Sequence, residues 1–233
     1  MDLSSRLNAA ECLDAAEHDV AQLEVTLDHL VDVNRWLGGT RVVLAHLAKW
    51  LPAEAAARVL DVGTGAGDIP RAVARWAAKR GRVVDICAVD LRSVIARQAR
   101  NRCRAEPSIR VLAADGMELP FASNTFDVAI SSMTLHHLDD SCAHRFVAEL
   151  ARVAACAVII NDLERHLINY IGARVLAATA WRGDAYTRHD GPVSVLRSFT
   201  VRELHGVGKR AGLRNVRVHR HFPYRLALIG QPS

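Results

Sequence analysis

The chain has 233 residues, of which 50% are hydrophobic and 24% are charged, and its formal net charge is +5. A chain of this length and hydrophobic content can bury a sizeable core. These values therefore exclude a disordered chain, a collagen-like or low-complexity sequence and a minimal disulfide scaffold. The first residues include acids where a signal peptide has basic and apolar residues, and no run of about 18 uncharged apolar residues occurs. The sequence therefore predicts a cytoplasmic protein without membrane insertion.

The N-terminal part of the chain predicts an amphipathic helix. Apolar residues recur at spacings of three and four, which places them on one helical face: Leu13, Ala16, Val20, Leu23, Leu27 and Leu30. This face either packs on the chain's own domain, as a core-facing or lid helix, or pairs with a second copy in a homodimer. Residues 1–33 also contain eight acids against a single arginine, so we expect this acidic segment to fold over a basic body.

A second short helix is predicted after the glycine pair at positions 38 and 39. Thr40 is suited to cap its start, and Pro52 ends it. We therefore expect residues 1–52 to form an N-terminal helical extension or lid. Residues 53–233 should form one domain with an insertion at about 163–200, on the side where a second substrate, the acceptor, would bind.

From residue 53 onward, β-rich segments alternate with helical ones. The predicted strands are 58–62, 83–90, 109–112, 126–131, 156–161, 213–219 and 224–229. Helices are predicted between them, at about 68–80, 92–104, 141–153, 163–181 and 200–211. Strands that alternate with helices form a parallel sheet covered on both faces, whereas the short link between the last two strands permits only an antiparallel pair. The expected fold is α/β and Rossmann-like, with a mostly parallel sheet and an antiparallel last strand.

A glycine-rich loop lies between the first predicted strand and the next helix. Residues 61–67 are D-V-G-T-G-A-G, and glycines at such a turn let a ligand approach the backbone closely. A dinucleotide loop of the G-x-G-x-x-G type would have glycine at position 68, where this chain has Asp68, and no G-K-[ST] follows. The loop thus predicts a ligand site that is neither of the nicotinamide type nor of the ATP type.

Two acids follow the next two predicted strands. Asp90 ends strand 83–90, where such folds bind ribose hydroxyls, and Asp115 follows strand 109–112, where a carboxylate can accept from an adenine amino group. Because the carboxyl ends of parallel strands share one edge of the sheet, we expect both acids to face the glycine loop.

These motifs resemble those of class I S-adenosylmethionine-dependent methyltransferases, especially the bacterial small-molecule, polyketide-type and quinone-type enzymes. The matching segments are DVGTGAG at 61–67, AVD at 88–90, ADGMELPF at 114–121 and FDVAISSMTLHHLDD at 126–140. The resemblance implies a seven-stranded sheet with an antiparallel final hairpin, and S-adenosylmethionine as the cofactor.

The resemblance also implies roles for individual residues. Those expected to contact the methionine part of the cofactor are Asp61, Gly63, Gly65 and Gly67. Asp90 corresponds to the ribose ligand, and Asp115 with Met117 to the adenine site. Arg41, in the segment NRWLGGTR, either binds the cofactor's carboxylate or is a surface arginine.

The segment after the fourth predicted strand argues against nucleic-acid substrates. It reads S-S-M-T at 131–134, in place of the Asn/Asp-Pro-Pro-Tyr/Phe motif of methyltransferases that act on planar amino groups. Only 5% of the residues are aromatic, so stacking platforms for bases are scarce.

The basic segment 202–225 either receives an acidic carrier protein or an anionic acceptor, or consists of solvated sheet-edge charges.

Histidines are the candidate catalytic residues. His136 and His137 follow the fourth predicted strand at the expected pocket mouth, where one of them is suited to act as a base. A second candidate is His189, whose neighbours Asp190, Gly191 and Pro192 predict a turn near the site, with an ordinary turn as the alternative. No histidine or cysteine group has metal-ligand spacing, so we expect no metal ion.

The sequence therefore predicts methyl transfer to a small hydrophobic acceptor that is aromatic, polyketide-like or quinone-like, at oxygen. Carbon methylation of a similar acceptor remains open, because an electron-rich phenolate can react through either atom. A catalytically inactive subunit that binds the cofactor and has a regulatory role is the alternative from another class.

Overall fold

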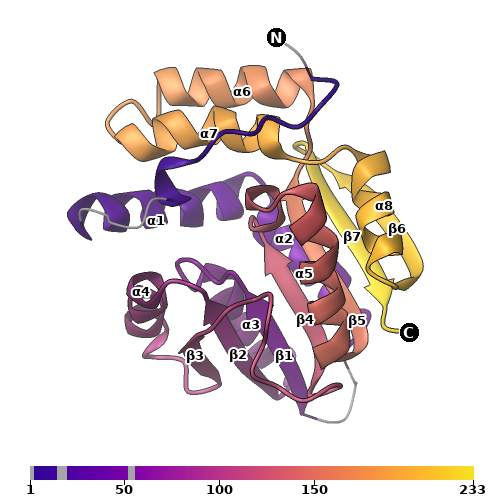
Figure 1. Cartoon of the computed structure of the whole chain (residues 1–233). Helices are drawn as coiled ribbons and strands as arrows, with labels where there is room; N and C mark the ends of the chain where they lie inside the picture. The colour runs from indigo at the N-terminus through magenta and orange to yellow at the C-terminus, as the bar shows by residue number, and fades with distance from the viewer. Residues whose placement is uncertain (1–2, 15–19, 52–55) are drawn as a thin grey trace.

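The computed structural model describes residues 3–14, 20–51 and 56–233 (Figure 1). One sheet contains seven strands in the order β3-β2-β1-β4-β5-β7-β6. These strands are β1 (Ala57–Val62), β2 (Val84–Asp90), β3 (Ile109–Ala113), β4 (Phe126–Ser132), β5 (Ala154–Leu163), β6 (Arg214–His221) and β7 (Arg225–Gln231). The first five pair in parallel, and β7 is antiparallel to both of its neighbours, β5 and β6. The predicted fold class is confirmed.

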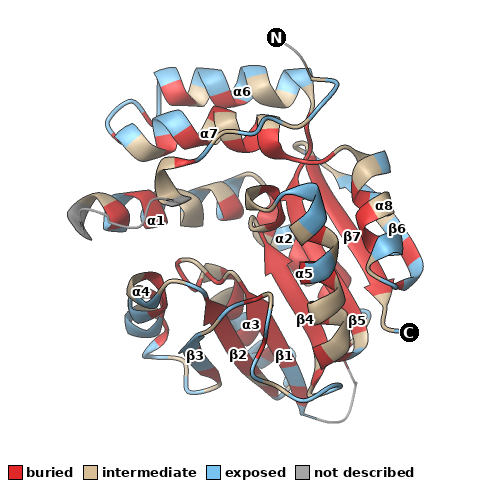
Figure 2. Ribbon diagram, in the orientation of Figure 1, coloured by how far each residue is buried: buried red, intermediate tan, exposed pale blue. Residues whose placement is uncertain are grey.

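Helices cover both faces of this sheet. Those on one face are α2 (Gly39–Leu47), α3 (Asp68–Ala78) and α4 (Ser93–Cys103), and those on the other are α5 (Asp140–Val153) and α8 (Val201–Arg210). Successive strand residues point to opposite faces, so Val59 packs in the first core and Leu60 in the second. Figure 2 shows that the central strands are buried almost throughout, which explains their nearly continuous apolar sequences.

Three further helices lie over the carboxyl edge of the parallel strands: α1 (Val20–Trp36), α6 (Leu167–Ala178) and α7 (Ala185–Arg197) (Figure 1). Leu23 and Leu27 of α1 pack against Ala66, in the loop after β1. Ala173 of α6 and Val195 of α7 pack together in a separate small cluster. None of the helices in the described part of the chain is both long and apolar enough to cross a membrane.

Residues 3–14, here called the N-terminal segment, run along α7 and include a short 3-10 turn, Cys12–Asp14 (Figure 1). The amide of Leu7 donates to the carbonyl of Leu196 over 3.0 Å, and the amides of Cys12 and Leu13 donate to the Asp190 carboxylate. The start of the chain is thereby held over the same edge of the sheet.

The N-terminal helices differ in detail from the prediction. Leu13 lies in the 3-10 turn, whereas Ala16 and Pro52 lie outside the described residues. Thr40 does not cap the second helix: α2 begins at Gly39, and its N-cap is Gly38, whose φ of 82° favours glycine.

The turn predicted around His189 is wrong, because residues 188–195 lie inside α7. Asp184 caps this helix by accepting from the amide of Tyr186. Gly191 serves a close contact rather than a turn, since a Cβ there would lie 2.6 Å from a ring carbon of Trp181. Packing between helices thus outweighs the local turn preference of Gly191 and Pro192.

Candidate active site

A cavity of about 520 Å³ lies at the carboxyl edge of the sheet. Its base is formed by the loops after β1, β2, β3 and β4, and the opposite side by α1, α6 and α7. In open parallel sheets, ligands bind at this edge. The helices contribute mainly apolar side chains, such as Leu27, Leu30, Ile168, Leu176 and Trp181.

The three glycines of the loop after β1 all have positive φ, between 52° and 75°. At Gly63 a Cβ would lie 2.1 Å from Thr134 Oγ1, and at Gly67 it would lie 2.7 Å from Cys103 Sγ, so these two glycines allow close packing. Gly65 differs, because nothing lies within 4 Å of the position of its Cβ, and it lines the cavity. Gly65 therefore leaves bare backbone beside free space, whereas Gly67 does not line the cavity.

Asp90, at the end of β2, connects the second strand to this loop. Its Oδ2 accepts from the amide of Gly65 at 3.0 Å and its Oδ1 from the amide of Arg92 at 3.1 Å. The residue is buried and lines the cavity, and burial raises its pKa. Each oxygen retains a further lone pair that can accept from a ligand hydroxyl.

Asp61 of β1 is buried under the same loop. Neither of its carboxylate oxygens has a hydrogen-bond partner among the described residues, although the residue lines the cavity. Burial raises the pKa of Asp61 to about 7 against the opposing effect of the nearby Thr64 hydroxyl, and the charges of Asp68 and Asp90 raise it slightly further. Because buried carboxylates are normally satisfied, this one suits a cationic or donor group of a ligand.

We expect Asp61 to make stability depend on pH. The carboxyl ionises at an ordinary pKa of 3.8 in the unfolded chain but at about 7 in the folded one, so the folded state binds more protons between these values. Stability therefore falls as the pH rises through this window, by about 4 kcal/mol in total. Asp61→Asn removes that loss, so the variant gains stability relative to wild type between pH 5 and pH 8 in urea unfolding.

The control for this experiment is Asp85→Asn on β2, because the Asp85 side chain is partly exposed and pairs with Arg110 at 2.7 Å. We expect this variant to change little between the two pH values. If Asp61→Asn and wild type lose the same stability from pH 5 to pH 8, Asp61 does not titrate in this window.

Asp115 and Met117 lie together in the loop after β3, and both line the cavity. The amide of Met117 donates to Asp115 Oδ1 at 2.8 Å. The predicted cofactor residues at the ends of β1 and β2 and in the loops after β1, β2 and β3 are thus brought to one wall. Gly67 and Arg41 are not part of it.

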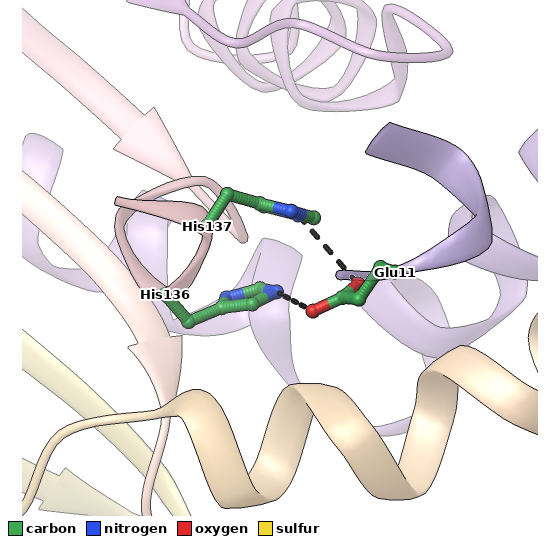
Figure 3. A group of neighbouring side chains, drawn as sticks. All are labelled: Glu11, His136 and His137. Carbon is green, nitrogen blue, oxygen red and sulfur yellow. Dashed lines mark ion pairs between the residues drawn. The ribbon is translucent and has the colours of Figure 1, made fainter. Parts of the chain in front are cut away.

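His136 and His137 lie in a 3-10 turn after β4 and face Glu11 of the N-terminal segment (Figure 3). Glu11 Oε1 lies 3.7 Å from Nε2 of His136, and Glu11 Oε2 lies 3.9 Å from Nε2 of His137. Ser194 donates to the same carboxylate at 2.9 Å, and Arg197 Nε lies 3.7 Å from it. Burial raises the pKa of Glu11 to about 7, against the opposing charge of His137.

His136 is also fixed from its other side by Asp162 of β5. Its Nδ1 lies 2.7 Å from Asp162 Oδ1, its amide donates to Oδ2 at 3.0 Å, and both side chains are buried. Burial alone would raise the pKa of Asp162, but the facing His136 and these hydrogen bonds hold it below its ordinary value. An ionised Asp162 favours the tautomer with the proton on Nδ1, which leaves Nε2 of His136 as a proton acceptor.

Three of the predicted site residues do not line the cavity: Gly67, as described above, Arg41 and His189. Arg41 donates from Nη2 to the carbonyl of Phe222 at 3.0 Å and does not line the cavity, so its position gives no support to a contact with the cofactor's carboxylate. His189 is exposed on α7, with Nδ1 2.8 Å from Asp190 Oδ1, because the helix that replaces the predicted turn directs it outward. Asp190 itself does line the cavity.

Sequence reasoning missed three residues of this site. Asp162 is the last residue but one of β5, close to the strand end as Asp90 is, and the same rule about strand ends signals it. Glu11 and Arg225 carry no such signal, because they reach the cavity only through contacts with residues far away in the chain.

The sequence also matches a family model described as a methyltransferase domain over residues 59–157, which run from β1 into β5 and carry the glycine loop, Asp90 and Asp115. Together with the sheet order, this match relates the chain to the class I S-adenosylmethionine-dependent methyltransferases. The resemblance inferred from the motifs is thereby confirmed. The methyl donor of this family is S-adenosylmethionine.

Curated relatives of this methyltransferase chain include two bacterial enzymes. It is 31% identical over 126 residues to a 2-phytyl-1,4-naphtoquinone methyltransferase of Trichormus variabilis, which covers 52% of this chain and 53% of that protein. It is 37% identical over 99 residues to a malonyl-[acyl-carrier protein] O-methyltransferase of Geobacter sulfurreducens, which covers 42% of this chain and 35% of that protein. The chain thus spans about half the length of the first relative and about a third of the second.

Solved structures share the whole fold. A SAM-dependent methyltransferase from Aquifex aeolicus superposes with a TM-score of 0.65 at 19% identity, over 93% of this chain and 100% of that one. At this identity the match extends the fold beyond residues 59–157 and says nothing of the acceptor.

Proposed function

We propose that this chain transfers a methyl group from S-adenosylmethionine to an oxygen of a small hydrophobic acceptor. The observation that carries the proposal is the meeting of two sets of residues in one cavity. Asp61, Gly65 and Asp90 line the cavity, and so does His136, whose ring is held by the buried Asp162. The first set suits a charged nucleoside, and the second suits removal of a proton.

The residues of the first set fit the donor, S-adenosylmethionine, in two respects. Asp61 offers a buried carboxylate without a hydrogen-bond partner, which suits the donor's ammonium group, and Gly65 leaves free space where a side chain would block the approach. Asp90 would hold the ribose hydroxyls, and Asp115 with Met117 the adenine ring.

The opposite side of the cavity supports an apolar acceptor. Leu176 and Ile168 of α6 and Trp181 after it line the space beside His136 and His137. Such a surface has little capacity to hold a hydrated sugar, but it suits an aromatic or polyketide-like ring. The relatives named after a naphtoquinone and a malonyl group also favour a small acceptor.

The chemistry requires orientation and loss of one proton. When bound, the donor supplies a methyl group on a positively charged sulfur: the carbon–sulfur bond breaks as the carbon–oxygen bond forms, leaving S-adenosylhomocysteine. His136 takes the acceptor's hydroxyl proton on Nε2, and Asp162 stabilises the imidazolium that results. Transfer requires the acceptor oxygen about 3–3.5 Å from the methyl carbon, in line with the bond that breaks, and the residues that line the cavity would have to hold it there.

Calorimetry with S-adenosylhomocysteine, followed by incubation with labelled donor and a panel of phenols, quinols and alkylpyrones, tests the proposal. We expect binding, and label in an alkali-stable ether on at least one phenol. Label on a ring carbon would replace oxygen methylation by carbon methylation. Binding without transfer to any acceptor would favour an inactive cofactor-binding subunit, and absence of binding would refute the proposal.

A further inference from the structure

Arg225 is a buried cation in the wall of the cavity. It is the first residue of β7 and pairs with Leu163 of β5, and its relative exposure is 0%. The side chain lines the cavity beside Met133, which follows β4, and Val33 of α1. An arginine is almost never fully buried unless a partner compensates its charge.

The partners of this guanidinium group are weak. Nη1 lies 2.7 Å from the thioether sulfur of Met133, and Nη2 donates to the carbonyl of Val33 over 3.4 Å. Nε has no hydrogen-bond partner, and among the residues that the structure describes no carboxylate lies within ion-pair distance of Arg225. A thioether is a poor acceptor, so most of the hydrogen-bonding capacity of the group is unused.

The charge itself is retained at neutral pH. Burial lowers the pKa of Arg225 to about 10, and Asp162 and Asp68 oppose this decrease from a longer distance. A buried positive charge without a direct counter-ion is costly to the fold, and proteins keep such groups where a ligand supplies the counter-ion.

The topology places Arg225 on the acceptor side of the cavity. The expected donor contacts follow β1, β2 and β3, whereas β7 lies beyond β4 and β5 on the other side of β1 (Figure 1). From β1 to β7 there are three steps between neighbouring strands, which correspond to a distance of about 14 Å. Leu163, the partner of Arg225 in the sheet, directly follows Asp162, which orients His136.

We propose that Arg225 binds an anionic oxygen group of the acceptor, a carboxylate or a phenolate or enolate oxygen, so that the acceptor is an acid. A guanidinium donates two parallel hydrogen bonds to such a group, and these are stronger in a cavity shielded from water. The inference rests on the proposed function and specifies the class of its acceptor.

The test uses the full chain saturated with S-adenosylhomocysteine and two probes of similar shape, benzoate and benzamide, of which only benzoate is anionic. The variant is Arg225→Met, and its matched control is Arg217→Met, because Arg217 is an exposed arginine on the neighbouring strand β6. Wild type and Arg217→Met should bind benzoate at least about tenfold more tightly than benzamide. For Arg225→Met we expect a ratio near one, and for Arg225→Lys an intermediate ratio.

Thermal unfolding separates this role from a structural one. Methionine fills a similar volume without a buried charge, so Arg225→Met should unfold within a few degrees of wild type. A large decrease in the unfolding midpoint, with the benzoate preference kept by Arg225→Lys and by any folded Arg225→Met, would make Arg225 structural and overturn the proposal. A wild-type protein that binds benzoate no more tightly than benzamide would also overturn the proposal.

A second pair of probes separates the acceptor from the donor as the source of the anion. 5′-Methylthioadenosine lacks the amino-acid part of S-adenosylhomocysteine, and with it the donor's carboxylate. If Arg225 binds the acceptor, Arg225→Met should bind both compounds as wild type does. A loss confined to S-adenosylhomocysteine would assign Arg225 to the donor's carboxylate and overturn the acceptor assignment. If wild type fails to bind S-adenosylhomocysteine, the proposed function fails instead.

Discussion

Replacing Asp90 by alanine should weaken the binding of S-adenosylhomocysteine by about 100-fold, because two hydrogen bonds to a charged acceptor are lost. The carboxylate also accepts from the amides of Gly65 and Arg92, so the variant loosens the loop that lies against the ligand. Isothermal titration calorimetry on the folded variant measures the loss.

The control for this variant is Asp85→Ala, on the same strand but partly exposed and paired with Arg110. We expect it to bind S-adenosylhomocysteine as wild type does. Equal affinities for Asp90→Ala and wild type would remove Asp90 from the ribose site, and an equal loss in both variants would mean that β2 itself is disturbed.

His136→Ala should reduce the rate of methyl transfer by about 10²–10⁴-fold, the usual contribution of a positioned base. Its affinity for S-adenosylhomocysteine should stay near that of wild type, since the proposed base acts on the acceptor and not on the donor. Asp162→Asn should show a similar but smaller loss, because an amide no longer favours the proton on Nδ1 of His136. Single-turnover rates with labelled donor and the best acceptor of the panel measure both effects.

Raising the pH distinguishes a base from a merely structural histidine. If His136 removes the acceptor's proton, the rate of His136→Ala should recover as the acceptor ionises in solution, whereas the wild-type rate changes less. His205→Ala, an exposed histidine of α8 outside the cavity, serves as the control and should keep the wild-type rate. A His136→Ala variant as fast as this control would exclude His136 as the base.

The sheet and the position of Asp61, Gly65 and Asp90 at the cavity could be predicted because local patterns specify them. Strands β1 and β2 are mainly apolar and carry Asp61 and Asp90 at their carboxyl ends, and the loop between β1 and α3 needs glycine at the positive φ of Gly63 and Gly65. Each of these signals lies within a few residues of the element that it describes, so no knowledge of tertiary contacts is required.

Glu11 and Arg225 could not be predicted as cavity residues in this way, because contacts between distant segments bring them there. Glu11 reaches His136 across more than a hundred residues of sequence, and the position of Arg225 depends on β7 being inserted between β5 and β6. In α7 the local signal was misleading: Gly191 and Pro192 are typical of a turn, but contact with Trp181 and the cap at Asp184 maintain a helix. The outward direction of His189 follows from that helix.

The insertion of β7 between β5 and β6 also bears on the order in which the site arises during synthesis. The cavity residues in and after β1, β2 and β3, up to Met117, are synthesised roughly a hundred residues before Arg225. Because β7 pairs with both β5 and β6, the sheet and the part of the cavity that contains Arg225 are complete only after the last strand has been made. We therefore expect a chain truncated before β7 to lack that part of the cavity.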